Sequence, residues 1–189
     1  MKFSFFNLIK STWGLMMSTQ VTWEAIRDKK CDDNAVRRTF TYPWILICAL
    51  TTFIFKTIYA DEKGLETGFL LFVVSMVSFL GAFFVTRKIA FSLLNKEGQH
   101  SFEKEKEEKL VAYSFAVIYV IDVVTNIIPS LFFLKILNVY SAYIVWEGSH
   151  ILLGMNDDER GRFVLIIGIS VIFLPGILSG IIHLMLPVL

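Results

Sequence analysis

The sequence predicts an all-α polytopic membrane protein with five transmembrane helices and an amphipathic N-terminal segment. Hydrophobic residues make up 55% of the 189 residues and aromatic residues 15%, more than a soluble domain of this size can bury in one core. The apolar residues gather in five runs of about 20 residues, the length that a helix needs to cross a bilayer. We therefore divide the chain into an N-terminal segment, 1–40, and a transmembrane domain, 41–189, with the lipid bilayer as its partner. The five predicted spans are 41–60, 68–86, 110–133, 136–154 and 163–186.

The positions of the 18 Lys and Arg residues predict the orientation of these spans. Seven precede the first span, six lie between the second and third, and two lie between the fourth and fifth. The other three are Lys56, near the outer end of the first span, and Lys63 and Lys135 in the remaining gaps. Because basic loops are retained in the cytoplasm, this division predicts a cytoplasmic N-terminus and a C-terminus on the opposite side. The charges follow the topology and the net charge is +1, so no nucleic-acid partner is expected.

Residues 1–40 contain an apolar pattern at helical spacing, with polar residues between its members. Its members are Phe3, Phe6, Ile9, Trp13 and either Met16 or Met17. The pattern predicts an amphipathic helix that lies in the cytoplasmic interface, or alternatively a helix packed on the underside of the bundle. A second short helix is expected to begin at Trp23. Pro43 fits the first turn of the first span, where a missing N–H has no consequence.

The stretch 95–109 is the largest gap between spans and carries charges of both signs. Glu105 and Lys109 are its oppositely charged i,i+4 pair in the favourable order. We expect a solvated, fraying helical extension of the third span here. The alternative is a docking site for a cytoplasmic protein partner, a role that the N-terminal segment could also have.

Small residues in two spans favour close helix packing in lipid. The fifth span contains a GxxxG at 176–180, and Pro175 just before it predicts a kink. The small face of the second span consists of Ser75, Ser78, Gly81 and Ala82.

Polar residues inside the third and fourth spans are the candidate functional residues, because ionisable groups are costly at membrane depth. Each set shares one face of its helix, and a short turn should join the two helices as an antiparallel hairpin. A turn centred near residue 134 pairs Asp122 with Glu147, whereas a span that ends at Pro129 places Asp122 level with Tyr140. The candidates are Tyr119, Asp122 and Asn126 on the third span and Tyr140, Tyr143, Glu147 and His150 on the fourth.

Three interpretations of this polar face stay open at the level of sequence. It is a hydrogen-bonded network that locks two helices together, a site where Asp122 and Glu147 share a proton or cation with His150, or a metal site. Glu147 and His150 form one E-x-x-H pair, whereas a di-iron centre takes ligands from four helices, so no metal or cofactor is predicted. Catalytic motifs are absent, and we expect no enzyme activity. His183 is expected to be a lone polar residue at the interface, and Lys56 to reach water from its span.

Three segments carry a resemblance to a known family. Residues 18–26 (STQVTWEAI) look like the S-P-x-x-x-W-x-x-I box of prokaryotic Yip proteins, with Thr19 in place of the proline. Tyr42 and Pro43 stand where that family has an aromatic-proline entry to its first span. Residues 140–148 (YSAYIVWEG) resemble its Y-x-x-Y-x-x-x-x-G signature in the fourth span. The Yip family consists of five-span proteins named for eukaryotic relatives that interact with Ypt/Rab GTPases.

The resemblance implies a membrane protein of prokaryotic Yip type with no assigned reaction, whose eukaryotic relatives act in vesicle trafficking. We therefore expect a non-enzymatic membrane-organising or partner-binding role, in a bacterial inner membrane. The alternative is a small transporter or a proton- or ion-linked channel that uses the intramembrane carboxylates.

Overall fold

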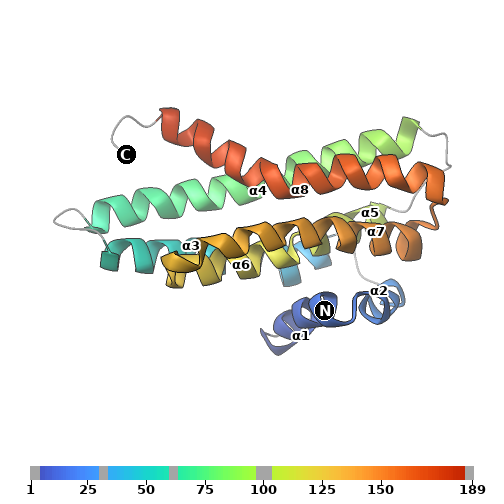
Figure 1. The fold of residues 1–189 in the computed structure, drawn as a ribbon, viewed down its shortest axis with the longest axis horizontal. Coiled ribbons are helices and arrows are strands. Elements are labelled where there is room, and N and C mark those ends of the chain that lie inside the picture. Colours follow the sequence, from blue (N-terminus) through green and yellow to red (C-terminus); the bar gives the residue numbers. More distant parts are fainter. Residues whose placement is uncertain (1–4, 30–33, 60–63, 97–103, 186–189) are drawn as a thin grey trace.

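The computed structural model describes residues 5–29, 34–59, 64–96 and 104–185. Phe3 of the predicted N-terminal pattern, Cys31, Lys63 and part of the 95–109 stretch lie outside these residues. Five helices in the described part are long and apolar enough to cross a membrane, which confirms the predicted all-α, five-span fold. Figure 1 shows them running side by side along the longest axis of the molecule. They are Arg37–Tyr59, Gly64–Asn95, Lys104–Ile127, Pro129–Leu153 and Asp157–Met185.

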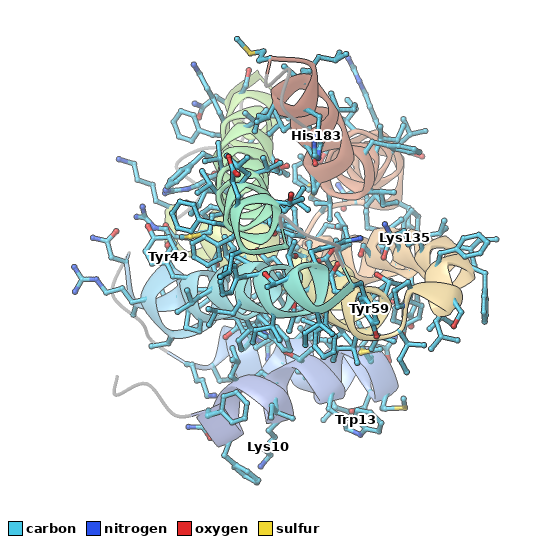
Figure 2. All side chains as sticks on the ribbon, turned by 90° about the vertical axis from the view of Figure 1, so that its left-hand side faces the viewer. Lys10, Trp13, Tyr42, Tyr59, Lys135 and His183 are labelled. Atoms are coloured by element: carbon cyan, nitrogen blue, oxygen red, sulfur yellow. The ribbon has the colours of Figure 1, made fainter. Side chains whose placement is uncertain are left out.

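The two N-terminal helices lie against the outside of this bundle. Helix α1 (Phe5–Met17) and helix α2 (Thr19–Arg27) are drawn below it in Figure 1, and Figure 2 shows α1 lying across the bundle. Leu8, Thr12 and Leu15 recur on one face of α1 and are buried against the bundle. Helix α1 is therefore packed on the bundle, which is the second of the two predicted arrangements, while other apolar residues of α1 face outward. Its location in the membrane interface stays a prediction.

The first two spans form an antiparallel hairpin. A π-helical turn, η1 (Arg37–Thr41), leads into α3 (Tyr42–Tyr59), with Pro43 in its first turn as expected. Helix α4 (Gly64–Lys96) follows and packs along both α3 and the last helix, α8. We call the end of the bundle where α4 ends and α8 begins the basic end, because it carries the basic residues near the ends of these helices.

The third span is the central helix of the bundle. It consists of α5 (Lys104–Ser114) and α6 (Ala116–Ile127), and its side chains are buried without interruption from residue 107 to residue 119. Two-thirds of its apolar window is buried, twice the share of any other span. The third span is therefore surrounded by protein over most of its length, whereas each of the other spans exposes one side.

The hairpin between the third and fourth spans turns earlier than the point near residue 134 that we considered first. Helix α6 ends at Ile127, and Ile128 leaves the helical region with φ −126° and ψ 87°. Pro129 is the physical reason, since a proline disfavours the helical conformation of the residue before it and has no N–H to continue the ladder. The chain resumes as a 3-10 helix, η2 (Pro129–Val139), and then as α7 (Tyr140–Leu153).

Helix α7 ends at Gly154, whose φ of +63° is a left-handed conformation that glycine adopts without strain. Helix α8 (Asp157–Met185) contains Pro175 and changes direction along its length in Figure 1, as predicted for that span. The predicted GxxxG at 176–180 is not a packing surface within the described chain, because a Cβ on either glycine would meet no atom within 4 Å. Close packing occurs instead at Gly81, where a Cβ would lie 3.0 Å from Leu178 Cδ1.

We predict that Gly148→Ala destabilises the fold. A Cβ there would lie 2.5 Å from Leu110 Cδ1 and 2.7 Å from Trp23 Cζ2, so the indole ring must shift. Overpacking of this kind costs about 1–3 kcal/mol, measured as thermal or denaturant unfolding of the full chain in detergent. Gly180→Ala is the matched control, because the same methyl group enters open space on a neighbouring span. Equal stability of the two variants would contradict the packing described here.

Candidate functional site

The predicted polar residues fall into two separate places rather than one ladder. The first is a cavity of about 310 Å³ in the half of the bundle away from the basic end. It lies between α3, α4, α6, η2 and α8. The polar residues that line it are Thr52, Ser75, Ser78, Asp122, Asn126, Lys135, Asn138, Ser179 and His183.

Asp122 and Asn126 form the hydrogen-bonded wall of this cavity. The Asn126 side-chain amide donates to Asp122 Oδ2 at 3.1 Å and to Thr52 Oγ1 at 2.9 Å, which joins α6 to α3. The buried Ser78 Oγ and Asn138 Oδ1 have no hydrogen-bond partner among the described residues. Buried polar atoms are normally paired with protein or ordered water, so these two atoms mark a space suited to water or to a polar ligand.

Of the nine polar residues in the cavity wall, sequence reasoning named only Asp122 and Asn126 as site residues, and it assigned Ser75, Ser78 and Ser179 to helix-packing motifs. Thr52 comes from the first span, and Lys135 and Asn138 come from the 3-10 segment η2, which the sequence pattern did not reveal. His183, which we expected to be a lone polar residue at the interface, also lines the cavity. Figure 2 views the bundle from this end and shows Lys135 and His183 on neighbouring elements. The position of Pro129 was the signal that could have placed Lys135 near Asp122. If the hairpin turns at Pro129, the two residues lie at similar distances along the chain on either side of the turn.

The fourth-span candidates do not join this cavity, which corrects the predicted pairing of Asp122 with Glu147. Glu147 instead accepts a hydrogen bond from Gln20 Nε2 on α2 at 3.1 Å. The Tyr140 hydroxyl lies 3.1 Å from Thr19 Oγ1 and donates to the Met16 carbonyl at 3.2 Å. The early turn at Pro129 and the longer rise of the 3-10 helix displace α7 along the bundle, so its polar face meets the N-terminal helices.

The other candidates have different surroundings. Tyr143 and His150 are exposed. Tyr119 is fully buried in an aromatic cluster, stacked on Phe115 and Trp44 with ring centroids 5.8 and 6.2 Å away. In the described part of the chain, no three His, Cys, Asp or Glu side chains are placed to hold one metal ion.

The second polar place is a buried ion cluster at the basic end, formed by Arg37, Arg87, Glu107 and Glu108. Both carboxylates are almost completely buried. Arg37 Nε lies 2.7 Å from Glu108 Oε1, and Arg87 Nη2 lies 3.1 Å from Glu108 Oε2. Arg87 Nε is 3.7 Å from Glu107 Oε1. The cluster therefore links η1, α4 and α5.

This burial corrects our prediction of a solvated, fraying extension before the third span. The expected Glu105–Lys109 pair is present, with 2.8 Å between Lys109 Nζ and Glu105 Oε1. Lys109, however, is buried and also donates to the carbonyl of Lys29, next to α2. Spacing within one helix could not reveal partners on other helices.

Two of the three segments that carried the family resemblance, 18–26 and 140–148, lie in contact. The Trp23 indole is fully buried and donates from Nε1 to the Ile144 carbonyl at 3.1 Å, while its ring covers Gly148. Trp23 and Thr19 come from the first segment, and Tyr140 and Gly148 from the second. The two segments thus form one interface between α2 and α7.

The fold and these sites define a class: a polytopic α-helical membrane protein of five spans with an N-terminal helix pair docked on the bundle. Comparison with known proteins then identifies the family. Residues 13–186 match the family described as the Yip1 domain, so the chain belongs to the Yip1 domain family, which confirms the resemblance.

One curated protein illustrates how far other similarity extends. The chain is similar to a vacuolar membrane protease of Paracoccidioides lutzii, with 24% identity over 114 residues. That similarity covers 55% of this chain but only 12% of the protease. No solved structure gives a significant match to this chain.

We predict that Glu108→Gln is strongly destabilising. The substitution leaves Arg37 and Arg87 partly buried without their shared carboxylate, and breaking a buried pair costs about 3 kcal/mol or more. Unfolding of the purified full chain in detergent measures the loss. Glu24→Gln makes the same chemical change at an exposed position of α2 and should stay within about 0.5 kcal/mol of the parent. A loss in both variants, or in neither, would contradict a buried cluster.

Proposed function

We propose that this Yip-type protein has a non-enzymatic, membrane-organising role, in which α1 lies in one leaflet of the membrane and is held at a fixed position by the bundle. The distribution of Lys and Arg supports a cytoplasmic N-terminus and a C-terminus on the opposite side. The resemblance to prokaryotic Yip proteins is the basis for proposing a bacterial inner membrane as the host. The single observation that carries the proposal is the outward face of α1.

That outward face is apolar. Phe6, Ile9 and Trp13 are 74%, 46% and 62% exposed, although each would be favoured in an apolar environment. Figure 2 shows Lys10 and Trp13 on the side of α1 that points away from the bundle. A helix with one face docked on protein, an apolar outer side and a lysine beside it suits the interface between hydrocarbon and headgroups.

The bundle holds α1 and α2 through specific polar contacts as well as packing. Trp44 Nε1 on α3 donates to Thr12 Oγ1 at 3.0 Å, and the Tyr140 hydroxyl reaches the end of α1. Trp23 fixes α2 on α7. Because each contact satisfies a buried donor, detaching the helix pair would leave unpaired groups, and the pair therefore keeps one orientation relative to the spans.

Partner binding is the closest variant of this role. The exposed charges of α2 and the 95–109 stretch could together receive a cytoplasmic protein. The buried Glu107, Glu108 and Lys109 cannot contribute to such a surface, which reduces the candidate region to the residues before them.

We do not extend the protease activity named for the fungal relative to this chain, since the similarity spans 12% of that protein. The buried ion cluster has no nucleophile, and its carboxylates are engaged by arginines. These contacts support a structural rather than a catalytic role.

We predict that a fluorophore on α1 enters lipid. With Cys31 and Cys48 replaced, a label at Trp13→Cys in the full chain, reconstituted in vesicles, should be quenched by lipids brominated on their acyl chains. A label at Glu24→Cys, on the exposed side of α2, should instead be quenched by aqueous iodide. Quenching of the Trp13→Cys label by iodide alone would contradict insertion.

The organising role itself predicts a change in vesicle shape. Vesicles containing the full chain should be smaller or more tubular by electron microscopy than vesicles containing the Phe6→Ser, Ile9→Ser and Trp13→Ser variant at equal density. If the two preparations are indistinguishable while the label still enters lipid, α1 is an anchor and the organising role is rejected.

One observation favours a second candidate function. The cavity beside Asp122 lies between the predicted spans, has polar side chains in its wall and contains buried polar atoms without protein partners among the described residues. An intramembrane carboxylate on such a cavity is suited to proton- or cation-linked transport.

The separation of Asp122 from Glu147 makes this alternative sharply testable. If a proton or cation passes through the cavity, Asp122→Asn should abolish gradient-driven flux in vesicles. Glu147→Gln should leave it unchanged, because Glu147 bonds to Gln20 outside the cavity. Absence of flux in the parent protein at any pH, or equal loss in both variants, would reject this alternative.

A further inference from the structure

A second hollow of about 310 Å³ lies on the outer surface of α4 and α5 at the basic end, and neither proposed role uses it. Its lining combines two phenylalanines, three cations and one carboxylate. These residues are Phe84, Arg87, Lys88, Phe91, Lys104 and Glu107. We call it the α4–α5 groove.

The groove follows from a regular pattern on α4. Phe84, Arg87, Lys88 and Phe91 are spaced i, i+3, i+4 and i+7, which places them on one face of the helix. The two phenyl rings are about 45% exposed and Lys88 is also exposed. One helix face therefore offers an apolar surface and a pair of cations at adjacent turns.

The charge of the groove is positive even after its internal ion pair is counted. Glu107 faces Arg87 at 3.7 Å, and Glu108 behind it is shared between Arg87 and Arg37. These contacts fix the Arg87 guanidinium, whose side chain is still 24% exposed toward the groove. Lys88 and Lys104 add two further cations at the rim, so the groove attracts an anion.

The position of the groove along α4 selects the kind of anion. Helix α4 has 33 residues and is about 50 Å long, whereas the hydrocarbon core of a bilayer is about 30 Å thick. An uncharged run of 20 residues, 67–86, is about 30 Å long as a helix and ends directly before Arg87 and Lys88. Phe84 thus faces acyl chains and the cations lie at the level of the headgroups.

We propose that the α4–α5 groove binds an anionic phospholipid, with its phosphate between Arg87, Lys88 and Lys104 and an acyl chain along Phe84. Basic pockets between helix ends are suited to such headgroups. The inference needs only the membrane-spanning fold and does not depend on the insertion of α1 or on transport through the cavity.

The test measures lipid binding to the delipidated full chain in detergent by native mass spectrometry. Phosphatidylglycerol should bind more tightly than phosphatidylcholine. Lys88→Gln and Lys104→Gln should each weaken phosphatidylglycerol binding by about fivefold, and the double variant by about 25-fold. Both lysines are exposed, so the variants should keep the parent unfolding temperature.

Arg162→Gln is the matched control, because it removes an exposed cation at the same end of the bundle but on α8, outside the groove. It should leave phosphatidylglycerol binding unchanged. Equal binding of phosphatidylglycerol by the double variant and by Arg162→Gln would overturn the proposal. Inorganic phosphate or glycerol phosphate that competes as well as the lipid would also overturn it, since the site would then recognise a soluble anion.

Discussion

The buried cluster of Glu107 and Glu108 with Arg37 and Arg87 is the interaction on which the basic end depends. Charges removed from water are stabilised only when their partners are held in good geometry. Here the arginines come from two different helices and converge on the one helix that is buried on all sides. The start of the first span, the end of the second and the start of the third are thereby fixed relative to one another. The fixed Arg87 in turn shapes the α4–α5 groove.

The N-terminal helix pair depends on this arrangement through a second set of contacts. Trp23 needs the glycine at 148 for its ring to lie flat on α7, and Tyr140 needs the end of α1 for its hydroxyl. Two short sequence segments, separated by more than a hundred residues, are therefore halves of one interface. Their contacts offer a physical explanation of the family resemblance, because Trp23 packs over Gly148 and Tyr140 bonds to Thr19 across the same interface.

Periodicity and charge were sufficient for the five spans and for the amphipathic character of α1, because both are local properties of the chain. They were insufficient where the outcome depends on three-dimensional partners. The register of the third and fourth spans required knowing that the chain continues past Pro129 as a 3-10 helix, whose greater rise moves every later residue along the bundle. The burial of Glu107 and Glu108 required knowing that arginines from two other helices face them. Neither glycine of the GxxxG motif at 176–180 packs against another helix within the described chain. A motif of small residues permits close packing between helices but does not determine whether a second helix lies there.

The two polar places are separated by a layer of rings, and this separation constrains function. Between the cavity at Asp122 and the ion cluster at Glu108, the central helix carries Phe115 and Tyr119, which are fully buried. The Tyr119 ring is stacked with Phe115 and with Trp44 from α3. The polar atoms of these three rings are the Trp44 indole N–H, which donates to Thr12 Oγ1, and the buried Tyr119 hydroxyl, which has no hydrogen-bond partner among the described residues. A proton or ion that moved from the cavity toward the ion cluster along the central helix would have to pass these rings. If the protein instead organises the membrane, its function does not require these rings to move. The aromatic layer therefore favours the organising role over transport, and it names Tyr119 as the residue whose mobility separates the two.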